Sequence, residues 1–380
     1  MAASVLVSRA YFPPQVGGIS YLMAEICAHL APDAVSVLTA VAGAATGGDG
    51  PTGVRVYRRP RTFEDTSVLH RFWMTLAFAE LALRERPRLL QFATIEDADT
   101  AWWAHRLLRL PYVIYAHGNE ILSAIGNRWD RPRQVLRSAA RVIANSRYTA
   151  DLVAQTGVDR TRIEVVHPGC DVERFQPRPV DQETRNAILG RHAGRRIVLT
   201  VGNLVERKGH DVAIRAMQRI ASRVPDACYL IAGDGPQRPA LEAMVQELGI
   251  ADRVLFAGRI SDRQLPLYYN LCDVFLMPSR ARLEQNDVEG FGIVFLEAGA
   301  CGKASIGGRS GGVTEAIVDG RTGLLVEPGD PDSVGVALSA LLGAPDYADR
   351  LGKQAREHVV AEHSWSRTGE RIAGILARVA

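Results

Sequence analysis

The chain has 380 residues, 47% of them hydrophobic and 23% charged, which is enough for two globular domains that each bury a core of their own. Its formal net charge of only +3 argues against nucleic acid as the main partner, and it contains no run of about 18 apolar residues that would span a membrane. The five cysteines are scattered without a Cys-x-x-Cys pair, so the sequence predicts neither a disulfide framework nor a zinc site and favours a cytoplasmic protein.

Strand and helix patterns alternate along the first half of the chain. Short apolar runs predict buried parallel strands at residues 5–8, 35–39, 89–93, 112–116 and 142–145. Helical spacing of apolar residues predicts intervening helices at 19–30, 68–84, 98–108 and 148–155.

The alternation then starts again in the second half. Strands are predicted at residues 197–201, 229–232, 254–257, 274–277 and 304–306. Helices are predicted at 212–221, 238–248, 265–271, 292–300, 333–342 and 364–379. Two β/α series of this kind predict an α/β protein with two doubly wound, Rossmann-like sheets.

Proline and glycine at His167-Pro168-Gly169 punctuate the point between the two series and suit a hinge. We therefore expect a first domain over residues 1–168, a second over 169–362 and a terminal segment over 363–380. Because open α/β sheets bind ligands at the carboxyl ends of their strands, the loops that follow the strands are where the chemistry is expected.

Residues 289–297, Glu-Gly-Phe-Gly-Ile-Val-Phe-Leu-Glu, form the most informative segment. A glycine turn that opens a helix presents unpaired N–H groups to an anion, most often a phosphate. Glu289 and Glu297 bracket this turn, and carboxylates suit pairs of vicinal hydroxyls on sugar and ribose. The pattern indicates a nucleotide-sugar site, with donor-binding candidates Gly290, Phe291, Gly292, Ile293 and Glu297; the alternative is an ordinary helix start.

Another glycine pair, Gly17-Gly18, opens the first helix after the first predicted strand. Glycines let a backbone approach a ligand closely, and the helix start adds a second positive dipole end. We expect these residues to contact the ligand, although many glycine pairs are simple turns.

The run from Asp287 to Gly302, followed by Ser310-Gly311-Gly312, resembles the paired-glutamate motif of retaining GT-B glycosyltransferases of family 4. It looks most like the bacterial phosphatidylinositol-mannoside mannosyltransferase branch. The resemblance implies two Rossmann-like domains facing each other across a cleft, with the last helix crossing back to the first domain. It also implies a metal-independent hexosyl transfer from GDP-mannose or a UDP-hexose, with Glu289 holding sugar hydroxyls.

The resemblance also assigns the loop after the first strand of the second domain to the donor diphosphate. Family members often carry an arginine after the first glycine and a lysine five positions later. Lys208 fits the lysine, but Asn203 stands where the arginine is expected. Either Arg207 replaces that cation, or the diphosphate relies more on the helix dipoles. The alternative for Lys208 is a solvated loop lysine.

His117 follows a predicted strand, and the resemblance places it beside the reacting sugar as a positioning group. A histidine at a strand end is otherwise more often structural. The acceptor is expected near Gly18, His117 and Asn119, with variable contacts from residues 46–51 and 121–133. The nucleobase is expected near Gly258, Arg259 and Ile260.

No metal or cofactor is expected. Asp97-Ala98-Asp99 imitates a metal-binding Asp-x-Asp pair, but acidic residues at a helix start are favoured by the helix dipole alone. The expected partners are a nucleotide-sugar donor and a sugar, lipid-linked or small polar acceptor, with peripheral contact to the inner membrane face as an option through arginines and aromatics of residues 71–109. Two alternatives remain open, a nucleotide-sugar epimerase or hydrolase of the same fold and a non-catalytic nucleotide-binding module.

Overall fold

A computed structural model describes residues 4–8, 11–15, 17–31, 34–41, 54–60, 68–97, 102, 105–106, 108–127 and 130–380. The chain divides into two compact units, residues 1–168 with 365–380 and residues 169–364. Within the described residues, no helix is both long enough and apolar enough to cross a bilayer.

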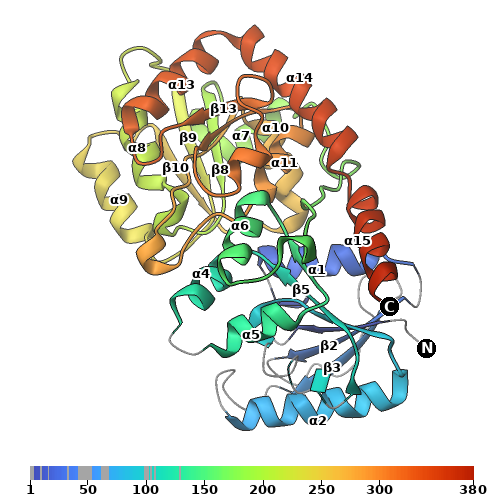
Figure 1. Ribbon diagram of the computed structural model, residues 1–380. Coiled ribbons are helices and arrows are strands. Elements are labelled where there is room, and N and C mark those ends of the chain that lie inside the picture. The colour runs from blue at the N-terminus through green and yellow to red at the C-terminus, as the bar shows by residue number, and fades with distance from the viewer. Residues whose placement is uncertain are drawn as a thin grey trace. The chain divides into compact units, whose positions relative to one another are not determined.

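The first unit is built on a parallel sheet that has seven strands in its described part, in the order β3-β2-β1-β4-β5-β6-β7 (Figure 1). The strands are β1 (Ser4–Ser8), β2 (Val35–Val41), β3 (Arg55–Pro60), β4 (Leu89–Phe92), β5 (Tyr112–Ala116), β6 (Arg141–Ala144) and β7 (Ile163–Val165). The helices are α1 (Gly18–Ala28), α2 (Val68–Glu85), α4 (Asn119–Gly126), α5 (Arg131–Ser138), α6 (Arg147–Gln155) and α15 (Trp365–Val379).

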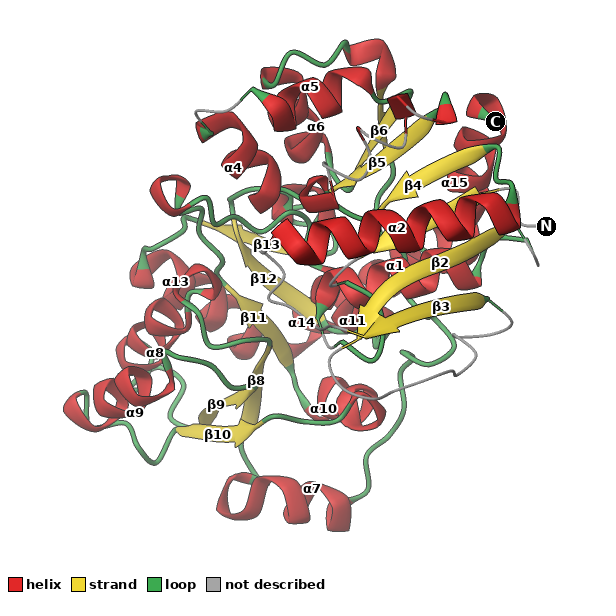
Figure 2. Cartoon of the chain, turned by 90° about the horizontal axis from the view of Figure 1, so that it is seen from below, coloured by secondary structure: helices red, strands yellow, loops and turns green. Residues whose placement is uncertain are grey.

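Alternate strand residues of this sheet feed two cores. Val5 and Val7 pack with Phe78 of α2, whereas Leu6 between them packs with α1 and α15 on the opposite face. Figure 2 shows α2 along one face of the sheet and α1 and α15 behind it. Burial on both faces explains why these strands are almost uniformly apolar.

The second unit has a parallel sheet of six described strands in the order β10-β9-β8-β11-β12-β13. The strands are β8 (Arg196–Val201), β9 (Ala227–Ala232), β10 (Val254–Gly258), β11 (Val274–Met277), β12 (Ala304–Gly308) and β13 (Gly323–Val326). The helices are α7 (Gln182–Leu189), α8 (His210–Arg219), α9 (Arg238–Glu247), α10 (Leu265–Leu271), α11 (Ile293–Ala300), α12 (Val313–Ala316), α13 (Pro331–Gly343) and α14 (Pro345–Glu362). One face packs on α8, α9 and α13, and the other on α7, α10, α11 and α14.

The prediction of two doubly wound parallel sheets is confirmed. Several elements were missed, namely β3, β7, β13 and the helices α4, α5, α7 and α14, whereas the short helix expected after Ser310-Gly311-Gly312 is α12. The prediction that residues 121–133 form a loop was wrong in part, because α4 and α5 occupy most of this segment. The predicted helix at 98–108 and the loop at 46–51 lie largely outside the described residues.

The two segments that connect the units are joined within the second unit. The backbone N–H of Cys170 donates to the carbonyl of His363 at 2.7 Å, and Cys170 and Ser364 form a parallel bridge. Pro168-Gly169 therefore lies where the chain first passes from one unit to the other, next to the segment where it passes back.

Candidate functional site

The strand order of the second sheet reverses at β8, because β9 and β10 lie on one side of it and β11 to β13 on the other. The loops that follow β8 and β11 therefore diverge at their carboxyl ends, which is where open α/β sheets bind ligands. Residues 202–209 form the first of these loops, and residues 278–292 follow β11.

A cluster of four charged side chains joins these two loops. Lys208 Nζ donates to Glu289 Oε2 at 2.7 Å, and Arg207 donates to the same oxygen through Nη1. Arg207 Nε also donates to Asp287 Oδ1 at 2.7 Å. Lys208 and Glu289 expose only 12% and 13% of their side chains, so the ion pairs are shielded from solvent. The structure thus brings three predicted site residues together.

The cluster shifts the pKa of its members in opposite directions. Burial alone would raise the pKa of Glu289, but the positive charges of Lys208 and Arg207 outweigh it and hold the pKa below its ordinary value. Burial lowers the pKa of Lys208, and Glu289 offsets only part of this effect. The carboxylate therefore stays ionised, whereas the lysine is easier to deprotonate than a lysine in water.

Glycines 311 and 312 fix the backbone beside this cluster. The N–H of Gly312 donates to the carbonyl of Glu289 at 2.9 Å. A Cβ added at Gly312 would lie 1.9 Å from the Gly290 oxygen, and one at Gly311 would lie 2.4 Å from the Glu289 oxygen. The Ser-Gly-Gly segment is therefore required for close backbone packing against the glutamate turn.

We expect Gly312→Ala to lower the melting temperature and the activity together. The added methyl overlaps a backbone atom, and overpacking typically costs about 1–3 kcal/mol of unfolding free energy, roughly 2–12 °C in a unit of this size. Thermal unfolding and transfer kinetics measure the effect. Gly343→Ala is the control, because its Cβ would meet no atom within 4 Å; equal behaviour of the two variants would contradict the packing role.

The start of α11 supplies the predicted anion-facing amides. Gly292 caps this helix in the left-handed conformation, with φ of 97°, and no side chain caps it. Its first N–H groups at Ile293 and Val294 are therefore available to a ligand. A Cβ at Gly292 would also lie 2.7 Å from the Phe295 ring, so the turn requires glycine.

Glu297 lies on the same helix in a different environment. It is 8% exposed, and Oε2 accepts a hydrogen bond of 2.6 Å from the Tyr269 hydroxyl. Burial raises the pKa of this carboxyl. Its binding to ribose hydroxyls stays a prediction, as do the roles of buried Phe291 and its neighbour Gly290.

Below the β8 loop, a buried network holds the backbone of the exposed residue Asn203. The ring of His210 approaches the Asn203 carbonyl with Nε2 and the Tyr229 hydroxyl with Nδ1, each at 3.3 Å, and the tyrosine reaches Thr200 at 2.8 Å. Burial lowers the pKa of His210 to about 4, so the ring is neutral and Nε2 can donate to the carbonyl. Asn203 thus exposes its side chain on a fixed backbone.

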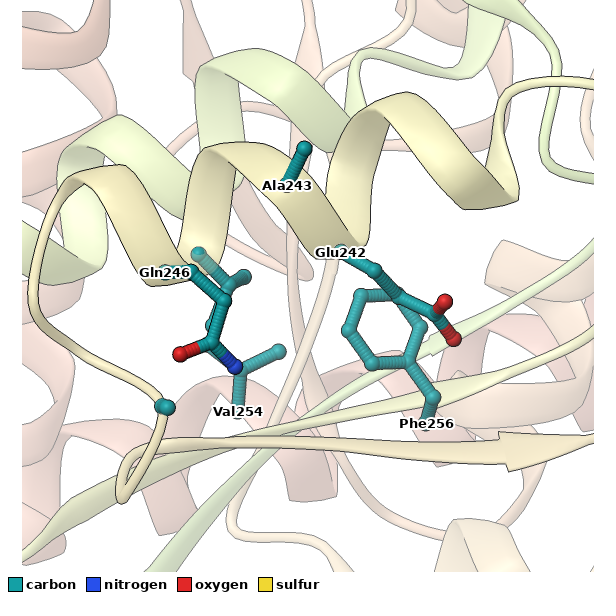
Figure 3. A pocket seen from close by; sticks show the side chains of 7 residues that line it. Glu242, Ala243, Gln246, Val254 and Phe256 are labelled. Atoms are coloured by element: carbon teal, nitrogen blue, oxygen red, sulfur yellow. The ribbon is translucent and has the colours of Figure 1, made fainter.

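The proposed nucleobase residues lie at the carboxyl end of β10, the edge strand of the sheet. Gly258 has φ of 70° and accepts from the N–H of Gly233 at 2.8 Å; Arg259 is exposed and Ile260 half-buried. A hollow of about 420 Å³ lies nearby between α9 and β10 (Figure 3). None of the predicted site residues lines this hollow. Its lining residues are Glu242, Ala243, Val245, Gln246, Ala251, Val254 and Phe256.

In the first unit, Gly17 caps α1 and Gly18 begins it, and both are exposed. A Cβ at either position would meet no described atom within 4 Å. Packing of the described chain therefore does not explain why glycine stands at these two positions. Contact between these glycines and the ligand stays a prediction.

His117 follows β5 and is nine-tenths buried. Its Nε2 donates to the Ala93 carbonyl at 2.8 Å, and its Nδ1 has no hydrogen-bond partner among the described residues. Asn119 begins α4 two residues later. Asp287, which pairs with Arg207, was not among the predicted site residues. Asp97 ends a 3₁₀ turn, and residues 98–100 lie outside the described chain.

Comparison with known proteins identifies the chain. Residues 16–174 match the model of Glycosyltransferase Family 4, and residues 181–358 match that of Glycosyl transferases group 1. A GDP-mannose-dependent alpha-(1-6)-phosphatidylinositol monomannoside mannosyltransferase of Mycolicibacterium smegmatis is 33% identical over 96% of each chain. A GDP-mannose-dependent monoacylated alpha-(1-6)-phosphatidylinositol monomannoside mannosyltransferase of Corynebacterium glutamicum is 31% identical over 99% of each chain.

Solved structures show the same architecture. A sucrose-phosphate synthase of Thermosynechococcus elongatus superimposes with a TM-score of 0.84 at 23% identity, covering 100% of this chain and 99% of the other. HepE of Anabaena, solved with UDP and glucose, gives 0.81 at 21% identity over 99% and 100%. The fold is thus GT-B, and the protein is a nucleotide-sugar glycosyltransferase. The chain belongs to glycosyltransferase family 4.

Proposed function

We propose that this enzyme transfers a mannosyl group from GDP-mannose to a hydroxyl of a sugar, lipid-linked or small polar acceptor, with retention of configuration. The observation that carries the proposal is the shielded cluster of Arg207, Lys208 and Glu289 at the switch point of the second sheet. The two GDP-mannose-dependent relatives, similar over nearly their whole length, favour GDP-mannose over a UDP-hexose.

The proposed chemistry follows from the charges. Lys208 and Arg207, with the amides at the start of α11, would bind the diphosphate and stabilise it as it leaves. Glu289, released from part of its pairing with the cations, would hold hydroxyls of the sugar. The acceptor oxygen would attack on the leaving-group side while a donor phosphate oxygen takes its proton.

We propose that no metal takes part. Two cationic side chains and a helix start offer the diphosphate oxygens charged and backbone hydrogen-bond donors. The same residues that carry the donor proposal therefore make a bridging cation unnecessary.

We also propose a cytoplasmic enzyme with peripheral contact to the membrane. Leu76 and Leu83 of α2 are 45% and 75% exposed, and Arg84, Arg86 and Arg88 follow Leu83 in the chain. Apolar and basic side chains together favour anionic lipid surfaces. Absence of sedimentation with anionic vesicles at low salt would contradict this contact.

GDP is expected to raise the melting temperature more than UDP does. Binding to the folded state alone stabilises it by about 2.7 kcal/mol at 100-fold excess over Kd. A thermal-shift series with both nucleotides, with and without a chelator, measures the preference. A larger shift with UDP would overturn the proposed donor.

Mass analysis of donor incubated with and without acceptor then tests the reaction. Transfer product that forms only with acceptor supports the proposal. An isomerised or hydrolysed donor as the only product would instead favour an epimerase or hydrolase. No product from either the unmodified protein or Glu289→Ala, with nucleotide still bound, would favour a module that only binds nucleotide.

A further inference from the structure

The two segments that carry the charged cluster, residues 202–211 and 278–292, have no surplus of positive charge. Both are described throughout, and together they contain four basic and five acidic residues. The basic residues are Arg207, Lys208, Arg280 and Arg282, and the acidic ones are Glu206, Asp211, Glu284, Asp287 and Glu289. A site that binds a diphosphate is expected to be positively charged, so the excess of carboxylates requires an explanation.

Two of the four cations are balanced by carboxylates one to one. Arg280 Nη1 donates to Asp211 Oδ2 at 3.0 Å, and Arg282 Nη1 lies 2.5 Å from Glu206 Oε2. The N–H of Arg280 also donates to the carbonyl of Arg207 at 2.9 Å, which holds the backbones of the two segments together. Within these segments, the two cations of the cluster are therefore the ones left for an anionic ligand.

Asp287 binds Arg207 in a different way from Glu289. Its Oδ1 accepts from Nε at 2.7 Å, whereas Glu289 accepts from Nη1 of Arg207 and from Lys208 through one oxygen. The backbone of Asp287 is fixed, since it pairs with Arg282 in an antiparallel bridge with N–H···O distances of 2.7 and 3.2 Å. A bond to Nε fixes the plane of the guanidinium, because this group is planar and rigid. Asp287 can therefore keep Arg207 in place while Glu289 turns to the sugar.

The charge of Asp287 also affects how strongly Arg207 attracts an anion. Burial lowers the pKa of Arg207, but the charges of Glu289 and Asp287 outweigh burial and raise it above its ordinary value. A carboxylate that stabilises a cation in this way competes with a phosphate for the same positive charge.

The product of the proposed transfer is more negative than the donor. The bond between the sugar carbon and the diphosphate oxygen breaks with its electron pair on that oxygen, the sugar carbon bonds to the acceptor oxygen, and the acceptor proton goes to a phosphate oxygen. The terminal phosphate of the product then ionises further with a pKa of about 6, so that at about pH 7.5 GDP carries roughly one negative charge more than GDP-mannose. A nearby carboxylate therefore weakens binding of the product more than binding of the donor.

From this we infer that Asp287 positions Arg207 for the diphosphate and, through its negative charge, keeps the nucleoside diphosphate product from binding too tightly to leave. The inference rests on the proposed transfer and adds one residue to its site. Asparagine at this position would keep an oxygen that accepts from Nε but would remove the charge. Binding of GDP should then become tighter, and binding of GDP-mannose should change less.

The test compares the unmodified full chain with Asp287→Asn. Titration calorimetry without acceptor gives Kd for GDP and for GDP-mannose, and product inhibition of the transfer gives Ki for GDP. We expect Kd and Ki of GDP to fall by about three- to tenfold and Kd of GDP-mannose to fall by a smaller factor. A GDP affinity that is unchanged or weaker, or an equal gain for both ligands, would overturn the inference. Failure of GDP to bind either protein would overturn the proposed donor, and the inference with it.

Two variants separate charge from position. Glu284→Gln removes the same charge from an exposed side chain of the same segment and should leave both Kd values unchanged. Asp287→Ala removes the charge and also the bond to Nε, so it should bind GDP less tightly than Asp287→Asn does; equal affinities would contradict the positioning role. Melting temperatures without ligand show whether each variant is folded. Asp287→Ser, which is neutral and can also accept a hydrogen bond, replaces Asp287→Asn if that variant does not fold.

Discussion

Glu289→Gln is expected to lower kcat/KM by about 10²–10³-fold. The substitution removes the one carboxylate that both Lys208 and Arg207 contact, and it leaves two largely shielded cations with only Asp287 as a counter-charge. Removing one partner of a buried charged pair typically costs about 3–5 kcal/mol, part of which appears as lost binding of the transition state. Steady-state kinetics with a fixed acceptor measure the loss.

The control for this variant is Glu284→Gln, which neutralises an exposed carboxylate in the same loop after β11. Acid stability gives a second readout. Because the pKa of Glu289 lies below its ordinary value, its ion pairs stabilise the fold fully above about pH 4.5 and lose this contribution as the pH falls through the folded-state pKa. Glu289→Gln should reduce the loss of stability with falling pH in this range. A stability profile equal to that of the unmodified protein would contradict the stabilising role of these ion pairs.

Lys208→Gln is expected to lower kcat/KM by about 10–150-fold, because a charged hydrogen bond to phosphate contributes about 1.5–3 kcal/mol. The unmodified enzyme should also lose activity at high pH. Burial and Arg207 lower the pKa of Lys208, so the cation disappears as the pH rises through a value below the usual 10.5. A pH profile of kcat/KM for both proteins measures this, and the high-pH loss should be absent from the variant.

Two further variants complete the lysine experiment. Lys353→Gln neutralises an exposed lysine of α14 and should retain full activity. The backbone of Asn203 is held by His210. Added to Lys208→Gln, the substitution Asn203→Arg should therefore restore part of the donor affinity that Lys208→Gln loses. If the double variant binds no better than Lys208→Gln alone, the exposed side chain at 203 does not face the diphosphate.

The sequence predicted the inner strands well because burial on both faces makes them continuously apolar. The missed strands all lie at sheet edges, where one side meets solvent. β3 carries arginines at positions 55, 58 and 59, and β7 has only three residues, all half-buried. β13 is four residues long and half-exposed in its middle. Short or charged edge strands lack the apolar run on which such predictions depend.

The residues of the site were predictable where they stand in a local sequence motif. Their contacts with residues far away in the sequence were not predictable. Glu289 and Lys208 were both singled out from their motifs, but their contact across 81 positions follows only from the strand order. The hydrogen bond between Tyr11 and Glu96 likewise has no signal in any motif, because only the placement of β1 beside β4 brings these two residues together. Glu297 kept its predicted place on the helix, yet its bond to Tyr269 carries no sequence signal.

The helix α15 also determines when the first unit can mature during synthesis. Trp365, Ile372, Ile375 and Leu376 belong to the same core as Leu6 and Phe12, although 196 residues of the other unit are translated in between. In a nascent first unit on the ribosome, one face of the sheet is therefore covered by α1 but not yet by α15. The second unit, contiguous in sequence, can close its own core before the first is finished.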